Sequence, residues 1–228
     1  MTATRPPAED SPGLRRAVID TARAMNDAGI NVNKAGNVSV RCARGRQEGL
    51  LITPTGLDYA KLQPADLVFL RLADAAASGG REPSSEWRFH LDIYRARPQF
   101  AAVVHTHSPA ATALACHGRG IPPFHYMVAT AGGADIRCAP YATFGTQALS
   151  DHALAALVDR KACLLAHHGV IACEASLPQA LALAIEVEYL ARMYLAASAL
   201  GEPPRLPDDE MARVLLKVDH YGQPAPGD

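Results

Sequence analysis

Four of the nine histidines in this chain stand at the ends of two apolar segments. His105 and His107 end one segment, and His167 and His168 end the other. Side chains two positions apart on a β-strand project from the same face, so the rings of His105 and His107 are expected to reach one ion. Adjacent strand residues face opposite sides, so only one of His167 and His168 is expected to join them.

Three imidazoles from two neighbouring strand ends are a donor set typical of zinc. Zinc accepts neutral imidazole and prefers four ligands, and a catalytic zinc site keeps its fourth position open. Such a metal acts as a Lewis acid. The alternative is a set of hydrogen-bonded polar residues, which is the ordinary role of a single histidine at a strand end. Isolated histidines are interpreted as structural or surface residues: His90, His117, His125, His152 and His220.

Glu86 follows two serines at the start of a predicted helix. An acidic residue there suits the helix dipole and the helix cap, and on this pattern alone that is the more ordinary interpretation. The functional interpretation is a general base, because a carboxylate near a metal-bound carbonyl could take a proton from the adjacent carbon. The cation would then stabilise the resulting enediolate.

Three short segments, 36–39, 53–56 and 83–85, are rich in Gly, Ser, Thr and Asn. Each could present hydroxyls and free backbone N–H groups to a small anion, and 83–85 lies at a predicted helix N-terminus, which favours phosphate. Turn chemistry explains each segment taken alone. A phosphate site requires all three to converge, and convergence depends on the fold.

Helical and extended patterns alternate along the chain. Helices are predicted over 14–28, 84–95, 109–116, 147–158, 177–200 and 208–218, and strands over 37–41, 50–53, 67–72, 101–106, 136–139 and 162–166. Interleaved helices and short, often adjacent strands predict an α/β or α+β layered domain with a mixed sheet covered by helices. A doubly wound nucleotide-binding fold is disfavoured because no glycine-rich phosphate loop motif occurs.

Composition favours one globular domain without a nucleic-acid or membrane partner. The chain has 228 residues, 49% of them hydrophobic and 20% charged, with a net charge of -1. No apolar run reaches the roughly 20 residues that span a bilayer, and residues 1–12 lack a signal-peptide pattern. Five cysteines without a C-x-x-C pair give no disulfide framework. We therefore expect a cytoplasmic protein with one domain over 14–222, between flexible tails at 1–13 and 223–228.

Five segments carry a combination of motifs found together in one family: 36–41, 51–56, 84–90, 103–107 and 167–169. Together they resemble the class II aldolase/adducin family, over about residues 14–221. The histidine motifs identify only the superfamily. More specific stretches resemble the L-fuculose-1-phosphate aldolase branch: 84–90, 125–127, 138–146 and 171–174.

This resemblance implies a fold and a set of roles. It implies a three-layer α/β domain, with a central, mainly antiparallel sheet and helices on both faces, and a cyclic homotetramer. It implies that Glu86 is the acid/base, that Tyr126 from a neighbouring subunit protonates the aldehyde oxygen, and that Tyr221 helps to close the site. It implies zinc ligands, with His168 favoured over its neighbour: His105, His107 and His168. It implies phosphate-binding residues: Asn37, Thr55, Gly56, Ser84 and Ser85.

The implied reaction is cleavage of L-fuculose 1-phosphate, or a similar ketose 1-phosphate, to dihydroxyacetone phosphate and L-lactaldehyde through a metal-stabilised enediolate. Alternatives on the same metal site are a sugar-phosphate 4-epimerase, a dehydratase and a decarboxylase. A non-enzymatic adducin-like module is disfavoured, because such relatives tend to lose metal ligands. Lys34 stands where relatives commonly have a small hydroxyl residue, and either adds charge near the phosphate or points to solvent.

Overall fold

The computed structural model describes residues 7–218, so Tyr221 and the predicted tail 223–228 lie outside it. Its helices are α1 (Pro12–Asp27), α2 (Trp87–Ala96), α3 (Pro109–Cys116), α4 (Gln147–Ala156), α5 (Leu177–Ser198) and α6 (Asp208–Val218), with 3-10 turns η1 (Tyr59–Lys61), η2 (Pro64–Asp66) and η3 (Tyr126–Ala131). Its strands are β1 (Ala8–Glu9), β2 (Asn37–Arg44), β3 (Gln47–Ile52), β4 (Val68–Arg71), β5 (Ala77–Ser78), β6 (Ala102–Thr106), β7 (Arg137–Ala139), β8 (Ala162–Leu165) and β9 (Gly169–Glu174). None of the helices in this range is long and apolar enough to cross a membrane.

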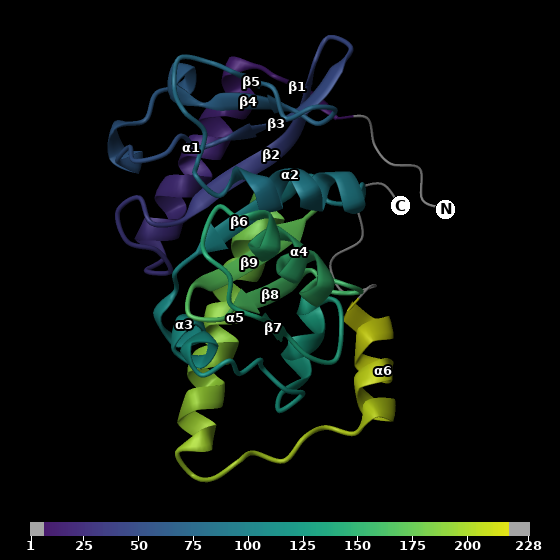
Figure 1. Cartoon of the computed structure of the whole chain (residues 1–228). Coiled ribbons are helices and arrows are strands. Elements are labelled where there is room, and N and C mark those ends of the chain that lie inside the picture. The colour runs from purple at the N-terminus through teal and green to yellow at the C-terminus, as the bar shows by residue number, and fades with distance from the viewer. Residues whose placement is uncertain (1–6, 219–228) are drawn as a thin grey trace, which may run out of the picture.

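One mixed sheet runs through the middle of the described part of the chain (Figure 1). Its nine strands include the path β5-β4-β3-β2-β6-β9-β8-β7, and β1 pairs with β2 beside this path. Neighbouring strands are antiparallel, except for the parallel pairs β1 with β2 and β7 with β8. The prediction of a central, mainly antiparallel sheet is confirmed.

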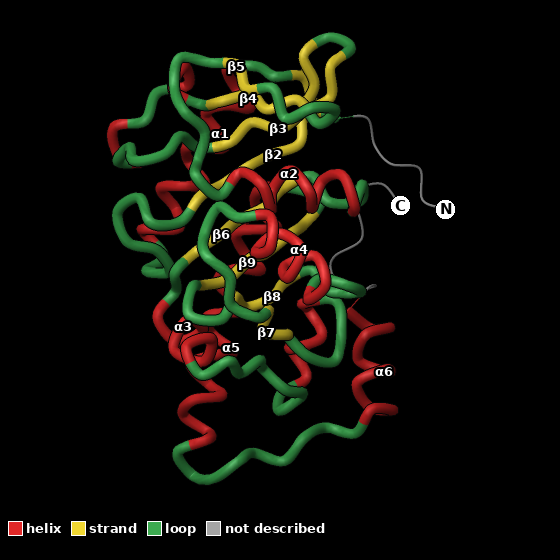
Figure 2. Tube along the Cα trace, in the orientation of Figure 1, coloured by secondary structure: helices red, strands yellow, loops and turns green. Residues whose placement is uncertain are grey.

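Helices cover both faces of the sheet, because alternate strand residues point into opposite layers. In β6, Ala102 and Val104 pack into the layer of α1, α3 and α5, whereas Val103 packs into the layer of α2 and α4. Figures 1 and 2 show α2 and α4 in front of the strands. His105 lies two positions after Val103 and therefore faces the α2 layer, where its ring meets Phe89 edge to face. The predicted three-layer arrangement is confirmed, and it directs the first histidine toward α2.

The chain is already part of the sheet before residue 13, where the predicted tail ends. Ala8–Glu9 pair with β2, and Asp10 accepts hydrogen bonds from Arg15 at 2.7 Å and Arg44 at 2.6 Å. Ser11 then caps α1 by accepting a bond from the Leu14 N–H at 3.2 Å. The two arginines are partners that the local sequence does not reveal, so the domain begins earlier than its apolar pattern indicates.

A central strand, β9, has no separate prediction from the sequence pattern. Gly169–Glu174 pairs with β6 on one side and β8 on the other. Only the residues 166–168 separate it from β8. In the sequence, the two strands therefore merge into one apolar stretch interrupted by the histidine pair.

A buried carboxylate on α5 holds the beginning of α3, two residues after His107. Glu188 is 2% exposed, and its oxygens accept hydrogen bonds from the N–H of Ala110 at 3.0 and 3.1 Å and from that of Ala111 at 3.0 Å. Arg192 donates a 2.8 Å bond to the same carboxylate. The first N–H groups of a helix lack partners within it, and the helix dipole favours negative charge there. Glu188 thus anchors the segment that carries His107.

The Glu188→Gln variant is expected to lower the free energy of unfolding by about 1–2 kcal/mol. The neutral amide loses the charge–dipole attraction and turns a donor toward other donors. Urea unfolding at fixed protein concentration measures the loss. Glu186→Gln on the same helix is the control: burial raises the pKa of Glu186, so folding disfavours its charged form and Gln costs nothing. Equal losses in both variants would contradict the capping role.

Candidate active site

Three histidine rings and one carboxylate meet at the end of β6. Glu86, His105, His107 and His168 each offer one ligand atom, and these atoms lie within 4.8 Å of one another. His105 Nε2 lies 3.1 Å from His107 Nε2 and 3.1 Å from Glu86 Oε2. His168 Nε2 lies 3.0 Å from Glu86 Oε1. The fold therefore brings the three predicted ligands together with the predicted base.

A backbone carbonyl determines which nitrogen of His105 faces this cluster. His105 Nδ1 lies 2.9 Å from the carbonyl oxygen of Val170 in β9, and a carbonyl only accepts, so Nδ1 carries the proton. The other ring nitrogen, Nε2, therefore faces His107 and Glu86, where it can serve as a ligand. Three ring nitrogens and a carboxylate oxygen that converge within 4.8 Å of one another can act as ligands of one cation. The chemistry of this donor set therefore fits a divalent metal ion.

The environment keeps two of these donors, His107 and Glu86, in the protonation states that bind a metal. Burial, assisted by the His105 and His168 rings, lowers the pKa of His107 to about 4, so this ring is neutral at pH 7. Burial alone would raise the pKa of Glu86, but His105 and His168 hold it below its ordinary value. Neutral imidazole and ionised carboxylate are the forms that ligate.

A tight turn between β8 and β9 separates the two adjacent histidines. The His168 N–H donates to the Leu165 carbonyl oxygen at 3.0 Å, and His167 adopts the left-handed conformation with a φ of 55°. The His167 ring lies edge to face with Tyr141, with 5.9 Å between the ring centroids, whereas His168 points at Glu86. Gly169 is required next, because a Cβ there would lie 2.3 Å from the Thr106 carbonyl oxygen.

Glu86 precedes α2, and its side chain turns away from the helix. It makes no capping hydrogen bond, and its φ of -103° and ψ of 15° are not helical. The helix predicted from Ser84 or Ser85 therefore begins at Trp87. Glu86 is 5% exposed and is held by the histidine cluster. The interpretation of this carboxylate as a helix cap is wrong, because partners from distant strands engage it instead.

The three predicted anion-binding segments meet beside Glu86, and Thr53 links them. Its N–H donates to the Val38 carbonyl oxygen at 3.1 Å, and its hydroxyl accepts from the Val38 N–H at 3.2 Å. Its carbonyl oxygen accepts from the Ser84 N–H at 3.0 Å. The convergence that a phosphate site requires is therefore present in the fold.

The predicted phosphate residues differ in how open they are. Thr55, Gly56 and Ser85 are exposed, and Gly56 adopts a φ of 72° that favours glycine. Ser84 is buried, and its hydroxyl accepts from the Glu86 N–H at 3.3 Å. Lys34 Nζ donates to the Gly56 carbonyl oxygen at 2.9 Å, which places a positive charge at these segments.

Behind Glu86, α2 and β2 contribute a buried row of polar side chains. Asn37 Nδ2 donates to Glu86 Oε2 at 3.0 Å, and Asn37 Oδ1 bonds to His90 Nε2. Ser39 Oγ lies 2.7 Å from His90 Nδ1 and 2.8 Å from the Tyr94 hydroxyl. His90, predicted to be a structural or surface residue, is a buried member of this row. The sequence signal for this row is a pair of polar residues two positions apart on the strand, Asn37 and Ser39, that faces residues four positions apart on the helix, His90 and Tyr94.

A cavity of about 280 Å³ opens beside the cluster. Its polar wall includes Glu86, His107 and His168, and its apolar wall includes Tyr141 and Phe144, whose rings are largely exposed. Neither aromatic residue is predicted as a site residue from the sequence. The remaining lining residues are Ala35, Ser85, Ala142 and His167.

The tyrosines with predicted roles lie outside this arrangement. Tyr126 begins η3, is 52% exposed, and lines neither the cluster nor the 280 Å³ cavity. Tyr221 lies outside the described residues. A single described chain therefore contains the cluster and the anion-binding segments without either tyrosine.

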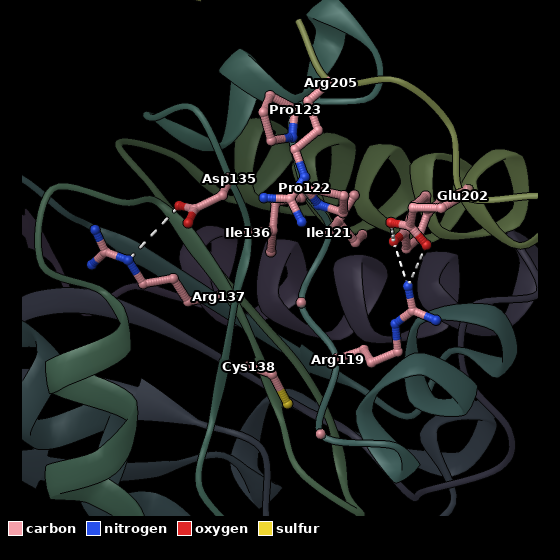
Figure 3. A pocket seen from close by; sticks show the side chains of 13 residues that line it. Arg119, Ile121, Pro122, Pro123, Asp135, Ile136, Arg137, Cys138, Glu202 and Arg205 are labelled. Carbon is pink, nitrogen blue, oxygen red and sulfur yellow. Dashed lines mark hydrogen bonds and ion pairs between the residues drawn. The ribbon is translucent and has the colours of Figure 1, made fainter. Parts of the chain in front are cut away.

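A second, larger cavity of about 400 Å³ lies apart from the cluster (Figure 3). Its charged side chains largely pair with one another: Arg119 donates to Tyr194 and Glu202, and Arg137 lies 3.7 Å from Asp135. None of the cluster residues lines it. The reactive groups are concentrated in the smaller cavity.

Comparisons with known proteins agree with this geometry. The family described as "Class II Aldolase and Adducin N-terminal domain" matches residues 16–195. The chain is 56% identical to the 5-methylthioribulose-1-phosphate/5-deoxyribulose-1-phosphate aldolase of Rhodospirillum rubrum, over 93% of this chain and 94% of that one. It is 51% identical to the L-fuculose phosphate aldolase of Escherichia coli K12, over 92% and 95%. A solved L-fuculose 1-phosphate aldolase superposes with a TM-score of 0.87 at 37% identity, over 92% and 97%.

The chain belongs to the class II aldolase and adducin family. Within that family it is an aldolase, a carbon–carbon lyase that acts on a small sugar phosphate. The motifs at 84–90 and 103–107, which carry the resemblance, are the segments that supply Glu86, His105 and His107.

Proposed function

We propose that this protein cleaves a ketose 1-phosphate between C3 and C4, giving dihydroxyacetone phosphate and a small aldehyde, with zinc held by His105, His107 and His168. The observation that supports this most directly is the cluster itself, whose four ligand atoms lie within 4.8 Å of one another beside a cavity and three anion-binding segments. When bound, the metal supplies Lewis-acid polarisation of the substrate oxygens.

Glu86 is the proposed acid/base. It lines the cavity and belongs to the ligand cluster, so its oxygens lie close to any substrate group drawn to the cluster. In cleavage, the C3–C4 bond breaks and its electrons remain on the dihydroxyacetone phosphate fragment as an enediolate. Glu86 in its protonated form then delivers its proton to C3, and the carboxylate left behind takes up a proton again before the next cleavage. In the synthetic direction the same carboxylate removes that proton.

The phosphate is assigned to the converged segments. Thr55, Gly56 and Ser85 are exposed there, and Lys34 adds a positive charge. Asn37 already donates one amide hydrogen to Glu86, and its second hydrogen remains for the phosphate. Ser84 is also assigned to the phosphate site, because its N–H donates to the Thr53 carbonyl oxygen and so joins two of these segments.

The reaction needs a group that takes the C4 hydroxyl proton, and Tyr126 of a neighbouring subunit is the proposed one. Its ring is 52% exposed on the single chain, as a residue that acts across an interface requires. This role requires an oligomer with sites between subunits, and the homotetramer that the family resemblance implies is the proposed one. Tyr221 is proposed to close the site, and the protein is proposed to be cytoplasmic.

Three candidate substrates are supported by two different relatives. L-fuculose 1-phosphate follows from the sequence motifs and from the 51% identical relative. 5-Methylthioribulose 1-phosphate or 5-deoxyribulose 1-phosphate follows from the 56% identical relative. All three carry an apolar end beyond C4, which suits a cavity wall containing Tyr141 and Phe144.

A coupled assay of dihydroxyacetone phosphate release tests the proposal. The purified protein, loaded with zinc, is given each of the three ketose 1-phosphates, and kcat/KM ranks them. Product NMR accompanies the assay, because an epimerase product keeps its carbon count. Absence of dihydroxyacetone phosphate from every substrate would reject the proposed reaction.

The Ser85→Ala variant is expected to raise KM for the ketose 1-phosphate about 10-fold, since one hydrogen bond to a charged group is lost. Inhibition by inorganic phosphate is expected to weaken in parallel. Steady-state kinetics measures both. Ser78→Ala, at an exposed serine on β5, is the matched control and is expected to change neither. A Ser85→Ala enzyme with unchanged KM and unchanged phosphate inhibition would remove this residue from the phosphate site.

A further inference from the structure

The buried row behind Glu86 has a single hydrogen-bond direction. A carboxylate only accepts, so the group of Asn37 that lies 3.0 Å from Glu86 Oε2 is its NH2. Asn37 Oδ1 then faces His90 Nε2. An amide oxygen also only accepts, so His90 Nε2 carries the ring proton. The charge on Glu86 thus determines the tautomer of a histidine that does not touch it.

The same logic continues to the far end of the row. Burial, with a smaller contribution from His105, lowers the pKa of His90 to about 3, so the ring is neutral and Nδ1 accepts. The Ser39 hydroxyl donates to Nδ1 across 2.7 Å and accepts from the Tyr94 hydroxyl across 2.8 Å. Every donor therefore points along the row toward Glu86.

Two facing elements build this row. Glu86, just before α2, is followed at intervals of four by His90 and Tyr94 within that helix, and Asn37 and Ser39 are spaced by two on β2. Glu86 is the most exposed of the five, at 5%. Buried polar groups are costly unless all are paired, and aligned hydrogen bonds polarise one another. A row in which each side chain bonds to the next, and which ends on one carboxylate, controls the position of that carboxylate.

We propose that His90 is a positioning residue for Glu86, which it serves by donating Nε2–H to Asn37 so that the amide keeps its NH2 toward the carboxylate. Ser39 and Tyr94 hold His90 in the required tautomer. A flipped Asn37 amide would place its oxygen against the Glu86 carboxylate. The two oxygens would repel, and the carboxylate would move away from the substrate carbon. The proposal rests on the proposed role of Glu86 as the base.

Two substitutions at one position separate positioning from packing. The side-chain nitrogen of Gln reaches the place of imidazole Nε2, whereas that of Asn reaches only the place of Nδ1. His90→Asn is expected to lower kcat about 10–100-fold with little change in KM, and His90→Gln is expected to recover most of that loss. Urea unfolding of both variants checks that they are equally folded. Equal kcat values for the two variants would overturn the proposal.

A spectroscopic measurement tests the tautomer without turnover. In protein labelled with ¹⁵N-histidine, two-bond ¹H–¹⁵N spectra report which ring nitrogen is protonated, and the His90 signals are those missing from His90→Gln. A proton on Nε2 is expected, and a proton on Nδ1 would overturn the proposal. Full activity of the Glu86→Gln variant would instead reject the proposed acid/base role of Glu86. The two failures are distinguishable because the tautomer is read in the resting protein.

Discussion

Replacing Glu86 by Gln is expected to lower kcat about 10²–10⁴-fold while KM for the ketose 1-phosphate changes little. Gln has nearly the same shape, and its amide oxygen can still face the histidine cluster, but it cannot take or return a proton. The phosphate segments remain intact, so substrate binding is retained. The coupled assay gives kcat and KM, and metal analysis of the same preparation gives the zinc content.

The metal content makes this experiment decisive, because Glu86 lies within ligand distance of the same point as the three rings. A variant that loses zinc and regains full activity with excess zinc would make Glu86 a ligand and not the base. Full activity without any zinc change would exclude both roles. Glu82→Gln, at an exposed glutamate four residues earlier, is the matched control and is expected to behave as the wild type.

The predictable part of the site is the part built by local periodicity. His105 and His107 reach the same cluster because strand alternation continues to His107, one residue past the end of β6. The same rule does not resolve His167 and His168, since these residues occupy a turn and not a strand. A φ of 55° at His167 sends the two rings to different partners. The family resemblance favoured His168, whereas residue spacing left the choice open.

Partners that are distant in sequence explain what periodicity missed. The position of Glu86 at a helix start predicts a helix cap. In the fold, its carboxylate contacts His105 and His168 and makes no hydrogen bond to the backbone N–H groups of α2. His90 looks isolated because Asn37 and Ser39 reach it only after β2 packs against α2. In both cases the helical pattern is correct and the side-chain role depends on a strand elsewhere in the chain.

The fold shows the same division between local and tertiary information. The helices α3 and α6 have the bounds that their patterns predict, because a proline or an acidic first turn marks their beginnings. The strand β9 has no such boundary signal, and β1 depends on the pairing of Asp10 with Arg15 and Arg44. Short sheet elements are therefore the part of this fold least accessible from sequence alone.

Removing the divalent metal is expected to lower kcat/KM at least about 100-fold, since Lewis-acid stabilisation of the reacting oxygens contributes several kcal/mol. The remaining side chains of the cluster do not supply the double positive charge that the metal brings to the substrate oxygens. Treatment with a chelator, removal of the chelate by gel filtration and titration with Zn²⁺ measure the loss and its recovery. The thermal midpoint is expected to fall on chelation and to rise again with Zn²⁺, because a ligand that binds only the folded state stabilises it.

The His107→Ala variant tests the same cluster without a chelator. It leaves the His105 bond to Val170 intact and removes one ring, so metal is expected to bind more weakly and activity to require added Zn²⁺. His117→Ala, at an exposed histidine just after α3, is the matched control and is expected to keep its metal. A metal-free protein that retains full activity and an unchanged thermal midpoint would refute the metal site. That outcome would leave the convergence of His105, His107 and His168 on one carboxylate without a bound cation as its reason.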